Sequence, residues 1–248
     1  MPEETLRTPR QRAHRQTMTE IKRTAIGQLE REGGAGLSLR AIARDLGIVS
    51  SAIYRYVPSR DDLLTLLIVD AYNSLGGAAE AAERRCRRTD LRRRWFAIGR
   101  AVRRWALTHR AEYGLLYGSP VPGYVAPPGQ TNVPGTRVSF LLLRLATDLE
   151  AAGAPLPDPT SPPRPLDRDL RRLRTYAERA ISEPRLAALL LAWTAMFGLV
   201  SFELFGQYNG VVGAHAAYFD HQLDRLAATL GLGEASRPSD RRSIRRTA

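Results

Sequence analysis

Residues 38–58 read SLRAIARDLGIVSSAIYRYVP, and this stretch decides the fold predicted for the chain. Apolar residues in its first half recur at positions i, i+3, i+4 and i+7, on one face of a helix: Leu39, Ile42, Ala43 and Leu46. Ser38 is a suitable N-cap for this helix, and Gly47 ends it. A short helix, a glycine turn and a second short helix that stops at Pro58 together predict a helix-turn-helix.

The second helix of this pair has one apolar and one polar face. It begins at Val49 or Ser50, with Ile53 and Val57 on its inner face. A helix of this kind can enter the major groove of DNA, which is roughly 12 Å wide. The residues expected to face DNA are Ser50, Ser51, Ala52, Tyr54, Arg55 and Tyr56. Ser51 and Arg55 would reach base edges and a tyrosine hydroxyl would bind phosphate, although Tyr54 could instead pack on the first helix.

These residues resemble the DNA-binding signature of the tetracycline-repressor (TetR) family of transcriptional regulators. The family's turn is matched by Leu46-Gly47-Ile48, and its recognition helix by Ile53-Tyr54-Arg55-Tyr56-Val57. The polar pair that follows this helix is matched by Ser59-Arg60. The whole match runs from about Thr17 to Leu67. The resemblance implies that Arg40 approaches a base edge and Arg60 a phosphate, whereas a surface arginine of no special role would simply be solvated. Val49 stands where the family usually has a polar residue, which would move the helix cap to Ser50.

Composition favours a folded, all-α protein with a small head and a larger body. The chain has 248 residues, of which 44% are hydrophobic and 25% charged. Its net charge of +12 is a weak argument for DNA binding, because residues 1–70 hold 11 basic and 9 acidic groups whereas residues 71–118 hold 11 and 4. The positions of particular arginines therefore matter more than the total.

Four segments are expected along the chain. Residues 1–16 are predicted to be a flexible basic arm, which would contact phosphate or the minor groove or be an ordinary disordered terminus. Residues 17–66 form the DNA-binding head, 67–232 a ligand-binding and dimerisation bundle, and 233–248 a disordered basic tail. Within the bundle we expect helices at 91–108, 138–152, 166–181, 183–207 and 214–230, with proline-rich loops at 118–134 and 155–165.

The segment 183–207 is the most hydrophobic of the chain. Its core, Leu186 to Phe202, falls short of the roughly 20 apolar residues that a membrane span needs, and Arg185 and Glu203 bracket it, so a buried helix is favoured over a membrane span. The resemblance implies that this helix and the last one pair with a second subunit as a four-helix bundle; the alternative is burial within one chain. A homodimer would place two recognition helices roughly 34 Å apart on a near-palindromic operator.

Aromatic residues from four helical patterns are expected to line a cavity for a small hydrophobic or amphipathic effector, although each alone is more often a core residue. The candidates are Trp95, Trp105, Tyr113, Tyr117, Phe140, Trp193 and Phe197, with Glu203 and His109 as polar groups that could orient the ligand. Trp193 to Gly198 also resembles a Trp-His-Gly signature in the ligand domains of some TetR-family members, with Phe197 in place of the histidine.

No constellation for catalysis or metal binding is visible. The four histidines do not pair at metal-ligand spacing, and no nucleophile elbow, phosphate-binding glycine loop or cysteine pair occurs, so we expect neither an enzyme nor a cofactor. A single cysteine and the lack of a secretory signal favour the cytoplasm. We therefore expect a TetR-like regulator, a repressor released by its ligand. The alternative is a helical small-molecule-binding or protein-interaction protein, whose helix-turn-helix serves only for packing and which would show no salt-dependent DNA binding.

Overall fold

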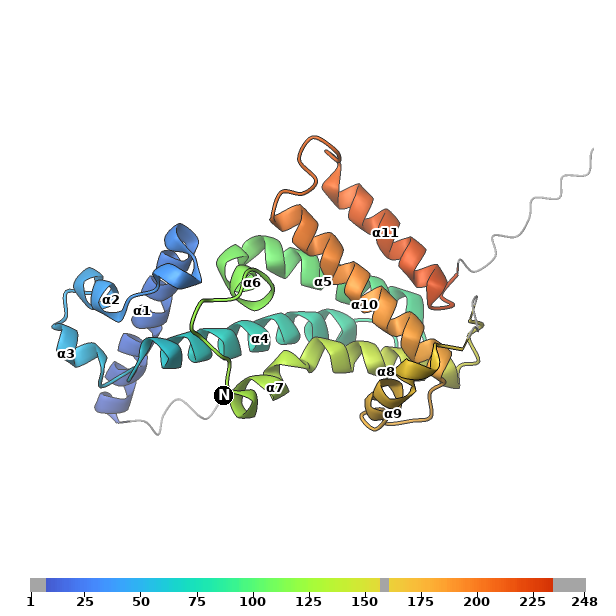
Figure 1. Ribbon diagram of the computed structural model, residues 1–248, viewed down its shortest axis with the longest axis horizontal. Helices are drawn as coiled ribbons and strands as arrows, with labels where there is room; N and C mark the ends of the chain where they lie inside the picture. Colours follow the sequence, from blue (N-terminus) through green and yellow to red (C-terminus); the bar gives the residue numbers. More distant parts are fainter. Residues whose placement is uncertain (1–7, 157–160, 234–248) are drawn as a thin grey trace, which may run out of the picture.

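The structure, a computed structural model, describes residues 8–156 and 161–233. Within these ranges every regular element is helical: eleven α-helices and two short 3-10 turns. Figure 1 shows a small head, a long helix that leaves it, and a larger bundle. The predicted all-α class, with a head and a body, is confirmed.

The head consists of α1 (Pro9–Glu32), the 3-10 turn η2 (Gly34–Gly36), α2 (Leu39–Asp45) and α3 (Ser50–Ile53). Their apolar faces meet in a core of their own, in which the side chains of Ile21, Ile42, Ile53, Val57 and Leu63 are completely buried. The helical periodicity read from residues 38–58 therefore places the expected residues in the head core.

Helix α1 begins at Pro9, eight residues earlier than expected, so residues 9–16 are not a mobile arm. The hydroxyl of Thr8 accepts a hydrogen bond from the backbone N–H of Gln11, and the Gln11 side chain accepts one from the N–H of Thr8. This capping box, with proline at the first helical position, is a strong start signal for a helix. The rest of the predicted arm, residues 1–7, lies outside the described residues, as do residues 234–248 of the predicted tail.

Helix α4 (Arg60–Arg84) connects the head to the body without a break. Ser59 caps it, and Asp61 and Asp62 lie in its first turn, where carboxylates are favoured by the helix dipole. Its first turns contribute Leu63 to the head core, whereas Leu75 belongs to the body core. One continuous rod of 25 residues, about 37 Å long at 1.5 Å per residue, thus shares side chains with both cores.

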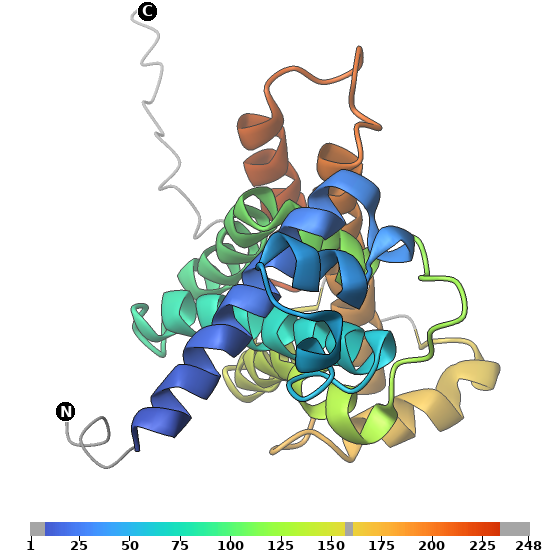
Figure 2. The same cartoon turned by 90° about the vertical axis from the view of Figure 1, so that its left-hand side faces the viewer.

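The body packs around α5 (Leu91–Thr108), whose bounds agree with the prediction. It is followed by the short α6 (Arg110–Tyr117), and the bundle is completed by α8 (Arg137–Ala151), α10 (Glu183–Leu204) and α11 (His215–Thr229). The Trp95 indole N–H donates to the carbonyl of Leu223 at 2.9 Å, which ties α5 to α11. Figure 2 shows α10 and α11 projecting together beyond the rest of the bundle.

Arginines on α5 are cross-links to other helices. Arg100 pairs with Asp220 on α11, Arg103 with Glu203 on α10, and the buried Arg94 with both Glu83 on α4 and Asp148 on α8. The basic excess of residues 71–118 is therefore largely matched by carboxylates from later helices. This explains why the overall charge was a poor guide to a DNA-binding surface.

Two segments differ from the prediction. Helix α7 (Pro128–Gly135) lies inside the expected loop 118–134, and α9 (Asp167–Arg174, after the 3-10 turn η3, Arg164–Leu166) is much shorter than the expected helix 166–181. Pro128 occupies the first turn of α7, where the missing N–H would have no helical partner in any case. Pro128 is therefore compatible with a short helix in a segment whose number of prolines argued against one.

Helix α10 is only partly buried. By length and composition it is the one helix of the described ranges that could cross a membrane, yet a core helix of a soluble protein meets the same test. The prediction of a buried helix holds for one face, where Leu186, Ala192 and Met196 are completely enclosed. On the opposite face Leu191 and Phe202 are 58% and 52% exposed.

Candidate nucleic-acid interface and ligand pocket

The turn of the helix-turn-helix has the geometry that the sequence predicted. Gly47 adopts a positive φ of 66°, a conformation that side-chain-bearing residues rarely take, and so lets the chain reverse between α2 and α3. Ile53 and Val57 anchor α3 and the turn after it, because both side chains are completely buried. The regular part of α3 spans four residues, Ser50–Ile53, and the chain continues in turns through Tyr56.

The polar face of α3 and of the turns that follow it, residues 50–56, points to solvent. Ser50, Ser51, Tyr54 and Arg55 are exposed, Ala52 is half-buried, and Arg40 lies exposed on α2. Tyr54 is 44% exposed, which argues against the alternative that it packs inward on α1. The helix therefore presents hydrogen-bonding groups outward on a rigid apolar backing, as direct readout of bases requires.

Tyr56 has a different environment from its neighbours. Its ring lies half-buried against the head core, and its centroid is 4.9 Å from that of His14 on α1. His14 belongs to the segment that was expected to be a flexible arm. The early start of α1 thus places His14 against the C-terminal end of the segment 50–56, and Tyr56 is only partly accessible to a phosphate.

Two local expectations are corrected. Ser50 is the first residue of α3 rather than its cap; Val49 occupies the cap position and offers no side-chain hydrogen bond. Arg60 is not poised for a phosphate, because its guanidinium donates to the carbonyl of Leu37 at 3.1 Å and to that of Gly34 at 2.7 Å. Arg60 therefore fastens the 3-10 turn before α2 to the start of α4.

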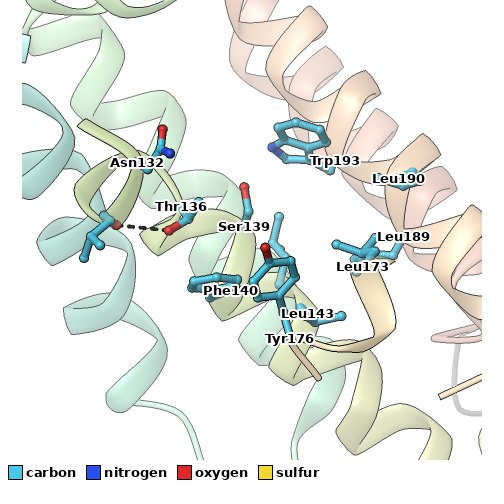
Figure 3. A pocket seen from close by; sticks show the side chains of 12 residues that line it. Asn132, Thr136, Ser139, Phe140, Leu143, Leu173, Tyr176, Leu189, Leu190 and Trp193 are labelled. Atoms are coloured by element: carbon cyan, nitrogen blue, oxygen red, sulfur yellow. Dashed lines mark hydrogen bonds between the residues drawn. The ribbon is translucent and has the colours of Figure 1, made fainter. Parts of the chain in front are cut away.

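A pocket of about 600 Å³ opens in the body between α7, α8, α9 and α10. Figure 3 shows its side chains converging from these helices, with Trp193 opposite the residues of α8. Two of the predicted ligand residues, Phe140 and Trp193, line it. Its volume lies within the roughly 300–1,000 Å³ typical of small-molecule sites.

The remaining aromatic candidates do not reach this pocket. Trp95 and Trp105 are core residues whose indole N–H groups are bonded to the Leu223 carbonyl and the Ser74 hydroxyl. Tyr113, Tyr117 and Phe197 form an aromatic cluster elsewhere in the core, with ring centroids 4.9 Å apart between successive members. Burial raises the pKa of both tyrosines, so they remain neutral.

The predicted polar ligand residues already have protein partners. The carboxylate of Glu203 receives two hydrogen bonds from Arg103, at 2.5 and 2.7 Å, and is 7% exposed. The His109 ring stacks on Trp105 with 4.8 Å between centroids, and its Nδ1 lies 3.0 Å from the Trp105 carbonyl. Glu203 cross-links α5 and α10. His109 lies between α5 and α6, where its contacts with Trp105 fix the position of its ring.

Sequence reasoning missed several residues of the pocket, notably Asn132, Ser139 and Tyr176. Asn132, Thr136, Ser139 and Leu143 recur at helical spacing, and this periodicity was the signal that could have found them. It was overlooked because Asn132 lies in a segment that was read as loop. Tyr176 follows α9, and nothing in its local sequence marks it as a pocket residue.

No group of three histidine, cysteine, aspartate or glutamate side chains in residues 8–156 and 161–233 is arranged to hold a metal ion. The assembled features are an outward-facing helix-turn-helix and a separate pocket in a helical body. Together they define the class of helix-turn-helix transcriptional regulators.

Comparison with known proteins agrees with this class. Residues 95–226 match the family described as "Tetracyclin repressor-like, C-terminal domain". The HTH-type transcriptional regulators Rv1816 of Mycobacterium tuberculosis (strain H37Rv) and Mb1846 of Mycobacterium bovis are each 40% identical to this chain, over 89% of it and 95% of the relative. The chain belongs to the TetR family, and like these relatives it is a transcriptional regulator rather than an enzyme.

Two solved structures share the fold. The crystal structure of the regulatory protein SCO4313 is 33% identical, with a TM-score of 0.73, and the match covers 89% of this chain and all of that one. A protein of unknown function from Rhodococcus sp. RHA1 is 23% identical, with a TM-score of 0.64, over 92% of this chain and all of that one. The Trp-His-Gly resemblance of residues 193–198 stays a prediction.

Proposed function

We propose that the protein is a homodimeric repressor that binds a near-palindromic DNA operator through Arg40, Ser50, Ser51, Ala52, Tyr54, Arg55 and Tyr56 and leaves it when a small molecule occupies the body. The observation that carries the proposal is the polar, exposed face of α3, held on a completely buried apolar backing. Arg60 is omitted from this set because its guanidinium is bound within the head. A cytoplasmic location follows from the need to reach genomic DNA.

The second subunit is proposed to cover the exposed face of α10. Leu191, Thr194, Gly198 and Phe202 follow one another along that face at helical spacing, with small residues in the middle and large ones at the ends. Such a stripe can pack against its own copy about a two-fold axis, because the small residues in the middle let the two helices approach closely at the axis. Two heads related by that axis would then read two half-sites roughly 34 Å apart.

Release by a ligand requires that the ligand bind one spacing of the heads more tightly than the other. The pocket is suitably placed, since Leu190 and Trp193 line it from the same helix that carries the proposed dimer face. Helix α4 contributes side chains to the core of the body and to the core of the head, so a displacement of α4 would be transmitted to the head.

The test is operator binding by variants of α3. Fragments of the host genome retained by the protein supply the operator, and a mobility-shift titration then compares Tyr54→Ala and Arg55→Ala with the unmodified protein. Loss of one base or phosphate contact is expected to weaken binding by about 10- to 100-fold, without loss of helical content. Arg31→Ala is the matched control, because Arg31 is an exposed arginine at the far end of α1.

The salt dependence separates this proposal from the alternative of a helical binding protein without DNA specificity. For a DNA-binding dimer the logarithm of the association constant falls linearly with the logarithm of the salt concentration. Unchanged affinity in both α3 variants, or retention of no duplex at low salt, contradicts the proposal.

A further inference from the structure

The wall of the pocket is graded from polar to apolar along one helical stripe. Asn132, Thr136 and Ser139 lie at its α7 end, and Phe140 and Leu143 follow on α8. In Figure 3 the three polar side chains lie together at one end, whereas the leucines gather at the other.

Two of the polar groups are available to a ligand. Within the part of the chain that the structure describes, the Asn132 amide and the Ser139 hydroxyl make no hydrogen bond to another side chain or to the backbone. The Thr136 hydroxyl, in contrast, donates to the carbonyl of Val133 at 3.0 Å. A neutral amide and a neutral hydroxyl can each donate and accept, so they suit a ligand group that does both.

The pocket has no charged group in its lining. Arg137 on α8 is turned toward α4, where it is bonded to Glu80 at 2.8 and 2.9 Å. Arg144 lines a separate cavity of about 150 Å³, together with Glu178. Phe140 and Tyr176 border both cavities, with 5.7 Å between their ring centroids.

We propose that this pocket takes an uncharged amphipathic molecule, whose apolar body lies among Leu143, Leu173 and Leu189 and whose single amide- or hydroxyl-like end is bound by Asn132 and Ser139. A carboxylate or an ammonium group is hydrated more strongly than an amide, and the lining offers no counter-charge that would favour it at this solvent-exposed end of the pocket. The inference rests on the proposed function, since it specifies the effector that the regulator answers to.

The experiment compares three probes of one length on the full chain: octanamide, octanoate and octylammonium. The amide and the carboxylate have nearly the same shape and differ in charge. Titration calorimetry at neutral pH is expected to show octanamide binding at least tenfold more tightly than either ion. Equal affinities, or tighter binding of an ion, overturn the proposal.

Emission from Trp193 gives a second readout that reports on the site. Trp95 and Trp105 are buried and hydrogen-bonded, whereas Trp193 lines the pocket and is 36% exposed. Octanamide is therefore expected to shield Trp193 from quenching by acrylamide, and Trp193→Phe should abolish that change. Shielding that persists in Trp193→Phe places the probe elsewhere and refutes the site.

Variants of Asn132 and Ser139 test whether these two side chains bind the polar end of the ligand. Asn132→Leu and Ser139→Ala are each expected to weaken octanamide binding by about five- to tenfold, the value of one neutral hydrogen bond. Gln130→Leu is the matched control, because Gln130 is exposed on α7 and does not line the pocket. Ser139→Lys should reverse the preference, so that octanoate binds more tightly than octanamide; no reversal contradicts the placement of the polar end.

Because these readouts need no DNA, their failure is distinguishable from failure of the proposed function. A protein that binds its operator but prefers octanoate refutes the ligand class alone. A protein in which none of the probes binds, while the operator is retained, refutes the ligand class as well.

Discussion

Replacement of the buried Arg94 by leucine should destabilise the body more than any other single arginine change on α5. The Arg94 guanidinium is 1% exposed and donates to Glu83 at 2.6 Å and to Asp148 at 2.7 Å. The Glu83 side chain is itself only 3% exposed. Without Arg94, two carboxylates at the junction of α4, α5 and α8 lose their central partner.

The magnitude follows from what remains around the carboxylates. Removing one partner of a buried ion pair generally costs about 3–5 kcal/mol, because a charge is left without compensation. Arg88 lies 3.2 Å from Glu83 and 2.8 Å from Asp148 and stays in place. We therefore expect the free energy of unfolding to fall by about 3 kcal/mol, at the low end of that range, and Tm to fall by about 6–12 °C.

The assay is urea unfolding followed by circular dichroism and tryptophan emission at one protein concentration, because the stability of the proposed dimer would depend on concentration. Arg93→Leu is the control, because this neighbouring side chain is exposed, and its effect should stay within about 0.5 kcal/mol. The double variant Arg94→Leu with Glu83→Leu should lose at least about 1 kcal/mol less than the sum of the single changes. A loss below about 1 kcal/mol in Arg94→Leu, or strict additivity in the double variant, refutes the reasoning.

Three further outcomes follow from contacts in the structure. Arg60→Ala removes the hydrogen bonds to the Gly34 and Leu37 carbonyls and should lower the stability of the head by about 1–3 kcal/mol. The salt dependence of DNA binding by the folded variant should stay the same. A shallower salt dependence would show that Arg60 contacts a DNA phosphate. Tyr124→Phe removes the 2.9 Å hydrogen bond to Thr65 and should cost about 1 kcal/mol in urea unfolding, whereas no measurable loss would show that this bond is not formed in solution. Arg137 holds the pKa of Glu80 below its usual 4.5 by direct hydrogen bonding, so the stabilisation is present above that pH and is lost as the pH falls through the lowered pKa. The stability difference between the native chain and Glu80→Gln should accordingly shrink in acid; a difference that is constant with pH would contradict this.

What could be predicted from the sequence was local. The face of α2 and the turn at Gly47 depend on residues within one or two helical turns of each other, and α5 has a periodic pattern between clear start and stop signals. The start of α1 was equally local, since Thr8 and Gln11 have the spacing of a capping box. It was missed because the prolines nearby were read as signs of a flexible terminus.

What could not be predicted depends on partners far along the chain. Arg60 is bound by carbonyls more than twenty residues earlier, and Arg103 is bound by a carboxylate 100 residues later. Glu203 looked available for a ligand because no local pattern reveals such a partner. The same limit explains the scattered aromatic residues, since burial in a core and exposure to a pocket leave the same apolar spacing in the sequence.

The route proposed from the pocket to the head is short. Asn132 and Thr136 line the pocket and also a second cavity of about 420 Å³, which Tyr72 on α4 and Tyr124 border from the other side. Tyr124 lies in the segment between α6 and α7, packs against the head core, and is joined to Thr65 on α4. A ligand bound by Asn132 would thus act on the wall that separates it from a head contact. A displacement of that wall would reach the head through Tyr124 and Thr65. In the proposed dimer it would then change the positions of the heads.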